Sequence, residues 1–144
     1  MKTTALIHID MIRRDVLFHF GNVTTLRKEL RKYHKKEIVD EVVENPPKEE
    51  TSSGRTIYSP DPYVMVVWLP CIPTTTDMFD TLVHEMFHAT VALMNSIGAS
   101  LSAESEETYA YLIGFLTKRV LEEFSISFCE NGLEPVSEQT LPAS

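Results

Sequence analysis

Two histidines and a glutamate are the residues of this sequence whose types and spacing best fit a defined chemistry. His84 and His88 are four residues apart, and Glu85 directly follows the first histidine. On an α-helix, positions i and i+4 lie on one face, so both imidazoles can bind a single ion, while Glu85 is rotated by about 100° toward the open side. This HExxH spacing is a zinc-binding pattern in which the glutamate can serve as a general base. The motif therefore predicts a hydrolytic Zn2+ site.

Two histidines leave the predicted site one ligand short. A catalytic zinc ion usually has three protein ligands and an open position for water. Glu106 and Glu107 are the first acids of the next predicted helix, and both begin a stripe of small residues through Ala110 and Gly114. Another helix can approach closely at such a stripe, and we expect the HExxH helix there, but periodicity does not choose between the two acids. Cys71 is a third candidate, because His2Cys sites also hold catalytic zinc.

The HExxH motif lies in a segment that should form a long central helix. Threonines at 74–76 offer a hydroxyl N-cap, and two aspartates place negative charge in the first turn, where the helix dipole favours it. The helix should run to about Ile97 and stop at Gly98, and its nearly all-round apolar character predicts burial. Burial leaves open that the histidines are hydrogen-bonded core residues, although the glutamate between them would then need a buried partner. The next helix should begin near 102 or 105 and end near 124.

A small antiparallel sheet is expected beside these helices. The predicted strands are 5–11, 16–20, 55–58 and 63–69. Strand 63–69 is the most apolar of the four and gives the clearest strand pattern in the sequence. In the simplest register of the first hairpin, with a two-residue loop, His8 faces His19, and we interpret this pair as strand positions because two ligands are too few for zinc. One more helix, from about 24 to 44, completes an α+β fold with three helices.

Length, charge and cysteine content bound the class of protein. The chain has 144 residues, 43% of them apolar, which predicts a single domain over 1–130 that does not need a metal merely to fold, followed by a disordered tail over 131–144. Thirteen basic residues against 21 acidic ones give a net charge of −8, the wrong sign for a nucleic-acid or anionic-membrane binder. Segment 45–54 should be a flexible loop that could act as a lid.

The location of the protein is predicted from what the sequence lacks. It has no run of 18 apolar residues and no N-terminal signal-like segment, so we expect a soluble, intracellular protein without a membrane partner. Cys71 and Cys129 lie in segments of different character, and we expect free thiols in a reducing compartment. These features together predict a cytoplasmic protein.

The HExxH motif followed by an acid-bearing helix resembles the gluzincin metallopeptidases. In that family a glutamate of the next helix is the third zinc ligand, and minimal members often carry ExxA or ExxAD there. Glu107 and Ala110 match ExxA, so the resemblance favours Glu107 over Glu106. The likeness covers roughly 63–120, which the resemblance implies to be an edge strand, 63–69, followed by the two site helices. It extends in a general way to short metallopeptidase-like proteins of bacterial viruses and mobile elements. It implies a minimal zincin core.

The resemblance implies a small zinc-dependent endopeptidase acting on a protein or peptide. Glu85 would be the general base toward the zinc-bound water and would then pass the proton to the leaving amine, and an extended substrate could pair with strand 63–69. The same residues would also serve hydrolysis of a non-peptide amide. Tyr111 departs from the family, because it stands where an Asp or Asn often orients a liganding histidine. This departure favours the alternative, a catalytically inactive zinc-binding protein with a structural or partner-binding role.

Overall fold

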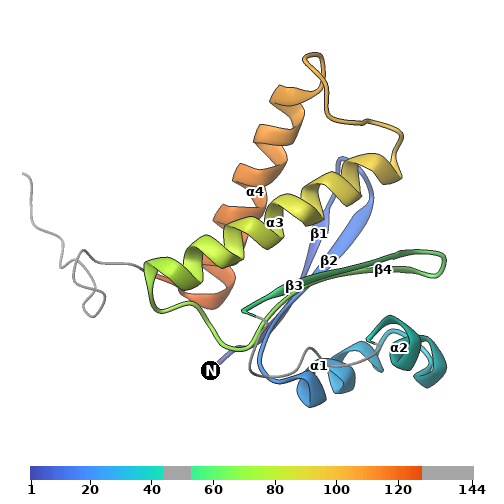
Figure 1. The fold of residues 1–144 in the computed structure, drawn as a ribbon, viewed down its shortest axis with the longest axis vertical. Coiled ribbons are helices and arrows are strands. Elements are labelled where there is room, and N and C mark those ends of the chain that lie inside the picture. Colours follow the sequence, from blue (N-terminus) through green and yellow to red (C-terminus); the bar gives the residue numbers. More distant parts are fainter. Residues whose placement is uncertain (44–52, 128–144) are drawn as a thin grey trace, which may run out of the picture.

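The computed structural model describes residues 1–43 and 53–127, in which helices cover both faces of a four-stranded sheet. The elements in chain order are β1 (Thr4–Ile9), β2 (Arg14–Phe20), α1 (Val23–Leu30), α2 (Lys36–Val42), β3 (Arg55–Pro60), β4 (Tyr63–Leu69), α3 (Thr76–Ser96) and α4 (Glu106–Phe124). Figure 1 shows α3 and α4 on one side of the sheet and α1 and α2 on the other. The predicted α+β class is confirmed. The predicted tail, Cys129 and most of the predicted loop 45–54 lie outside the described residues.

The sheet is mixed rather than wholly antiparallel. Its strand order is β1-β2-β4-β3, with antiparallel β1–β2 and β3–β4 pairs and a parallel β2–β4 pair in the middle. The prediction that 63–69 is the edge strand was wrong, because β4 lies between β2 and β3. Residues 64–69 are all buried, which is typical of a strand covered on both faces. The edge strand beside α3 is β3.

The first hairpin has a longer turn than predicted, and this changes which residues face each other. Ile9 pairs with Arg14, so four residues connect the strands. His8 therefore faces Asp15 and His19 faces Thr4, and the predicted His8–His19 pair does not exist. A hairpin register follows from the turn, and the assumed two-residue turn shifted it.

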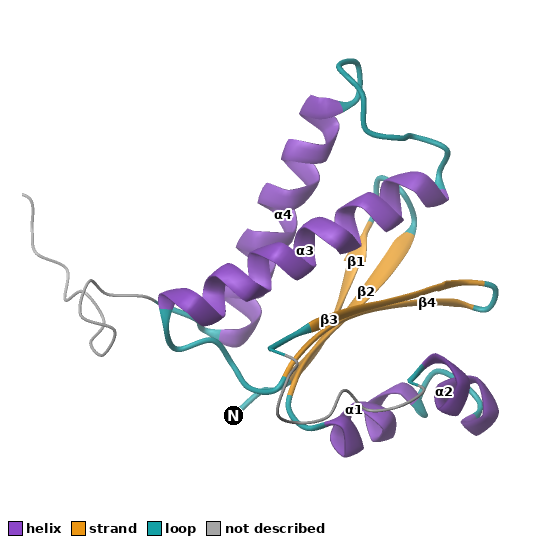
Figure 2. Cartoon of the chain, in the orientation of Figure 1, coloured by secondary structure: helices purple, strands orange, loops and turns teal. Residues whose placement is uncertain are grey.

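Two hydrophobic cores lie on opposite faces of the sheet. The larger one joins α3 and α4 to the sheet, and the smaller one joins α1 and α2 to the other face, as Figure 2 shows for the helices. The predicted helix over 24–44 is in fact two short helices, separated by a turn over 31–35. This break lets Leu26 and Val39 both reach the smaller core. Among residues 1–43 and 53–127, no helix combines the length and apolar content that crossing a membrane requires.

Helix α3 begins and ends as the sequence predicts. The Thr75 hydroxyl accepts a hydrogen bond from the Met78 amide at 3.2 Å, and Gly98 adopts a left-handed φ of 78° just after the helix. Most of the residues between them that face the sheet are buried. The motif is therefore held on a helix that is capped at its start and packs into the larger core.

Helix α4 presents a different face to the core than predicted. Its buried residues are Tyr109, Leu112, Leu116, Val120 and Phe124. Ala110 and Gly114 are exposed, and a Cβ added at Gly114 would meet nothing within 4 Å. The prediction that this small-residue stripe contacts the HExxH helix was wrong, because the stripe of larger apolar side chains buries more surface and occupies the core.

Candidate metal and catalytic site

The two histidines of the motif point their ring nitrogens at each other on the outer face of α3. The His84 and His88 Nε2 atoms are 3.1 Å apart, and the ring centroids are 4.7 Å apart. Both side chains are exposed, so the reading of these residues as hydrogen-bonded core histidines is wrong.

The spacing of the two nitrogens fits a shared metal ion. Zinc–nitrogen distances near 2.0–2.1 Å and a tetrahedral angle would place two imidazole nitrogens about 3.3 Å apart. The observed 3.1 Å between His84 and His88 is close to this value. No group of three or more His, Cys, Asp or Glu residues that could hold a metal occurs among the described residues. The structure therefore brings together two of the predicted ligands.

The predicted third ligand, Glu107, is not brought to the histidine pair. Glu107 is exposed on α4, and it lines a shallow surface hollow with Gly114 and Lys118. At 100° per residue it lies about 160° around the helix from the buried Tyr109, whereas Glu106 lies about 60° from Tyr109. Glu106, also exposed, is thus nearer to the packed face.

The structure does not bring Cys71, the alternative third ligand, or Tyr111, which departs from the family pattern, to the histidine pair either. Cys71 is an exposed free cysteine. Tyr111 is 70% exposed and lines an apolar hollow with Met11 and Phe115. Within the described part of the chain, neither histidine of the motif has a hydrogen-bond partner besides the other. The structure therefore shows no residue in the orienting role that the family gives to an Asp or Asn.

Glu85, the predicted general base, is buried between α3 and the edge strand. Its side chain is 9% exposed, and one carboxylate oxygen accepts a hydrogen bond from the Thr56 hydroxyl of β3 at 2.7 Å. The same hydroxyl lies 2.8 Å from the backbone carbonyl oxygen of Glu85, so its single proton is shared. A buried carboxylate needs such a partner, because burial without one is costly.

The start of β3 packs closely over this carboxylate. A Cβ added at Gly54 would lie 3.3 Å from Glu85 Cγ and 3.0 Å from Thr81 Cγ2. These are close contacts for carbon, so Gly54 permits the approach of β3 to α3. Neither Gly54 nor Thr56 was predicted as a site residue, because the contact joins residues far apart along the chain and periodicity reports only local neighbours. A correct assignment of β3 as the edge strand would have been the signal.

Comparisons with protein-family models, with curated proteins and with solved structures gave no match. The function must therefore be inferred from the chemistry of the site itself.

Proposed function

We propose that this protein is a zinc-dependent metallopeptidase of the endopeptidase type, in which His84 and His88 bind the metal and Glu85 is the general base. The observation that carries the proposal is the convergence of the two Nε2 atoms, 3.1 Å apart, on a helix that also directs Glu85 toward the edge strand. When bound, zinc would supply a Lewis acid that activates water and polarises the scissile carbonyl.

Glu85 is suited to hold and move a proton. The Thr56 hydroxyl donates to Oε2 and fixes the orientation of the carboxylate. The other carboxylate oxygen is then available to take a proton from the attacking water and to deliver it to the leaving amine. Thr56 is thus a positioning residue.

The edge strand supports a polypeptide substrate. Strand β3 pairs with β4 on one side, and it is the outermost of the described strands on the other. An extended peptide can add to such an edge through main-chain hydrogen bonds. Because Thr56 lies on this strand and contacts Glu85, a peptide along β3 would pass beside the base.

Glu107 remains the proposed third ligand, on the strength of its ExxA match, and Glu106 is the alternative, on the strength of its position nearer to the packed face of α4. The second candidate function is an inactive zinc-binding protein with a structural or partner-binding role. The observation that favours it is that the described residues give the histidine pair neither a third ligand nor an orienting partner.

Peptide cleavage by matched variants separates the two functions. The zinc-loaded protein is incubated with a mixture of unrelated peptides and the products are read by mass spectrometry, alongside Glu85→Gln and His88→Ala. We expect cleavage by the unaltered protein, loss of cleavage with retained zinc in Glu85→Gln, and loss of both in His88→Ala. Zinc binding without cleavage of any peptide would favour the second function, and equal cleavage by Glu85→Gln would reject the proposed base.

A further inference from the structure

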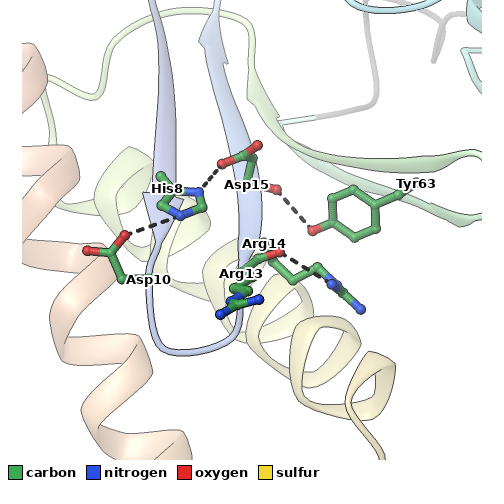
Figure 3. A network of polar contacts seen from close by, with 6 residues as sticks. All are labelled: His8, Asp10, Arg13, Arg14, Asp15 and Tyr63. Atoms are coloured by element: carbon green, nitrogen blue, oxygen red, sulfur yellow. Dashed lines mark hydrogen bonds and ion pairs between the residues drawn. The ribbon is translucent and has the colours of Figure 1, made fainter.

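A second group of polar residues lies around the β1–β2 turn, and it borders a cavity of about 650 Å³. Figure 3 shows Arg14 extending beside Tyr63 of β4, with Arg13 next to Arg14 in the turn. The lining of the cavity includes Arg13, Arg14 and Asp15 of the hairpin, Tyr58 of β3, and Asn95 and Ser96 of α3. We call this space the arginine cavity. Two arginines and one aspartate line it, in a protein whose net charge is −8.

Arg14 has unused hydrogen-bonding capacity at the arginine cavity. Its Nε atom is buried and has no hydrogen-bond partner among the described residues. Its Nη1 donates to the Arg13 carbonyl at 3.3 Å, and its guanidinium carbon lies 5.5 Å from the centroid of the Tyr63 ring. A buried donor without an acceptor costs about 1–3 kcal/mol. The donors left for a bound acceptor are those of the guanidinium terminus, where only Nη1 has a hydrogen-bond partner among the described residues.

Arg13 adds a second positive charge, and the acid that lines the cavity, Asp15, is paired elsewhere. Arg13 has a left-handed φ of 50°, which costs a non-glycine residue about 1–2 kcal/mol, and such strain is often retained at functional positions. The Asp15 carboxylate also borders the cavity, but its Oδ1 is 2.6 Å from the Nδ1 of His8, and Figure 3 shows it turned toward that histidine. Neither arginine forms an ion pair with a described residue.

Capping of α3 does not account for the two arginines. Cations are favourable near the C-terminal end of a helix, where the last carbonyl groups lack partners inside the helix. Here the Leu93 carbonyl accepts from the Ser96 hydroxyl, and the carbonyls of Met94 and Asn95 accept from backbone amides beyond the helix. Arg13 and Arg14 are therefore not used to cap α3, and their terminal donors are left for a ligand.

The arginine cavity lies in line with the candidate catalytic site. Asn95 follows His84 by eleven residues, about three helical turns, and Ser96 follows Glu85 by the same interval, so each pair shares one face of α3. Thr56, Tyr58 and Pro60 are alternate residues of β3, so their side chains lie on the same face of the strand. Thr56 contacts Glu85, and Tyr58 and Pro60 line the arginine cavity.

This alignment sets the distance between the two sites. Thr56 pairs with Val67, and Tyr58 pairs with Met65. Val67 and Met65 both belong to the larger core under α3, so the face of β3 that carries Thr56 and Tyr58 is the face toward α3. The rise of a strand places Pro60 about 13 Å beyond Thr56. An extended peptide along β3 would span this distance with about four residues.

We propose that the arginine cavity is a specificity subsite, in which Arg13 and Arg14 bind the carboxylate of an Asp or Glu side chain in the substrate, about three to five residues from the scissile bond. Arginine suits this role because its planar fork of donors matches a carboxylate. The proposal rests on the proposed peptidase function. It names the substrate class as polypeptides with an acidic residue at that spacing.

The test scans one glutamate along an otherwise neutral peptide of serine, alanine and leucine, with glutamine at the same positions as the reference. We expect kcat/KM to rise about tenfold for glutamate over glutamine at one position, three to five residues from the cleaved bond. Arg14→Gln should abolish this preference, Arg13→Gln should weaken it, and Arg14→Glu should shift it toward lysine. Arg55→Gln is the matched control, because Arg55 is an exposed arginine that alternates to the opposite face of β3, and it should leave the preference unchanged.

A binding measurement keeps this proposal separable from the peptidase proposal. The Nε–H resonance of Arg14 is followed by NMR in the Glu85→Gln protein while the glutamate and glutamine peptides are titrated. A shift with the glutamate peptide alone, without cleavage by the unaltered protein, supports the subsite and rejects the peptidase. Cleavage that is indifferent to glutamate at every position, or that keeps its preference in a folded Arg14→Gln protein, overturns the subsite and leaves the peptidase standing. Neither cleavage nor a shift overturns both.

Discussion

Replacing Thr56 with valine removes the hydroxyl that holds the Glu85 carboxylate while keeping the shape of the side chain. In the structure this hydroxyl is 2.7 Å from a carboxylate oxygen of a side chain that is only 9% exposed. A hydrogen bond to a charged group contributes about 1.5–3 kcal/mol to stability. We therefore expect Thr56→Val to lower the free energy of unfolding by about 2 kcal/mol.

A double-mutant cycle isolates the part of this loss that belongs to the carboxylate. In a Glu85→Ala background the hydroxyl keeps only the backbone carbonyl as acceptor, a neutral bond that contributes about 0.5–1.5 kcal/mol. Thr56→Val should therefore cost about 1 kcal/mol less in that background than in the unaltered protein, as measured by urea unfolding monitored by circular dichroism.

Thr56→Ser is the matched control for the loss of the hydroxyl. Thr56→Ser keeps the hydroxyl, so it should retain the coupling to Glu85 and, in the zinc-loaded protein, most of the peptidase activity. An equal cost of Thr56→Val in both backgrounds would refute the account of Thr56 as the positioning residue of the base.

The remaining predictions concern pH, packing and the third ligand. Burial lowers the pKa of His19 below its ordinary value of 6.5, so the stabilising contribution of the neutral ring is complete above pH 6.5 and is lost as the pH falls toward the lower folded-state pKa. Urea unfolding from pH 7.5 to 5 should therefore show a flatter pH dependence of the free energy of unfolding in His19→Gln, and identical curves for the two proteins would contradict this. Gly54→Ala should destabilise the protein by about 1–3 kcal/mol through its contacts with α3, whereas Gly114→Ala should stabilise it by about 0.5–1 kcal/mol, because Gly114 has open space around it in a helix. Changes of the same sign in the free energy of unfolding of both variants would reject the packing argument. Glu107→Gln should weaken zinc affinity more than a hundredfold, which exceeds the loss expected from a residue that only orients a ligand, and Glu106→Gln should not. Competition with a chelator measures both affinities, and a larger loss in Glu106→Gln than in Glu107→Gln would make Glu106 the ligand.

The local features of α3 were predictable from the sequence, and the contacts between distant segments were not. A threonine before the first turn and Gly98 after the last are local signals, and the helix lies where they place it. The prediction of β4 as a strand is confirmed, but its continuous apolar run is typical of a strand buried on both faces and not of the edge strand that the resemblance implies. The position of an element in a sheet depends on pairing between distant segments, which the local pattern does not contain.

The candidate site divides in the same way. The i, i+4 geometry of a helix was sufficient to predict that His84 and His88 would meet. The contact between Thr56 and Glu85 depends on how β3 packs against α3, and the orientation of Glu107 depends on which face of α4 enters the core. Several apolar stripes are possible on such a helix, and the bulkier one was buried.

X-ray absorption spectroscopy of the zinc-loaded protein determines whether His84 and His88 bind one metal ion together. We predict two imidazole nitrogens at about 2.0–2.1 Å from the zinc in the unaltered protein and in Glu85→Gln, and one fewer in His84→Ala or His88→Ala. A zinc environment without imidazole, or one that neither histidine substitution changes, would contradict the account.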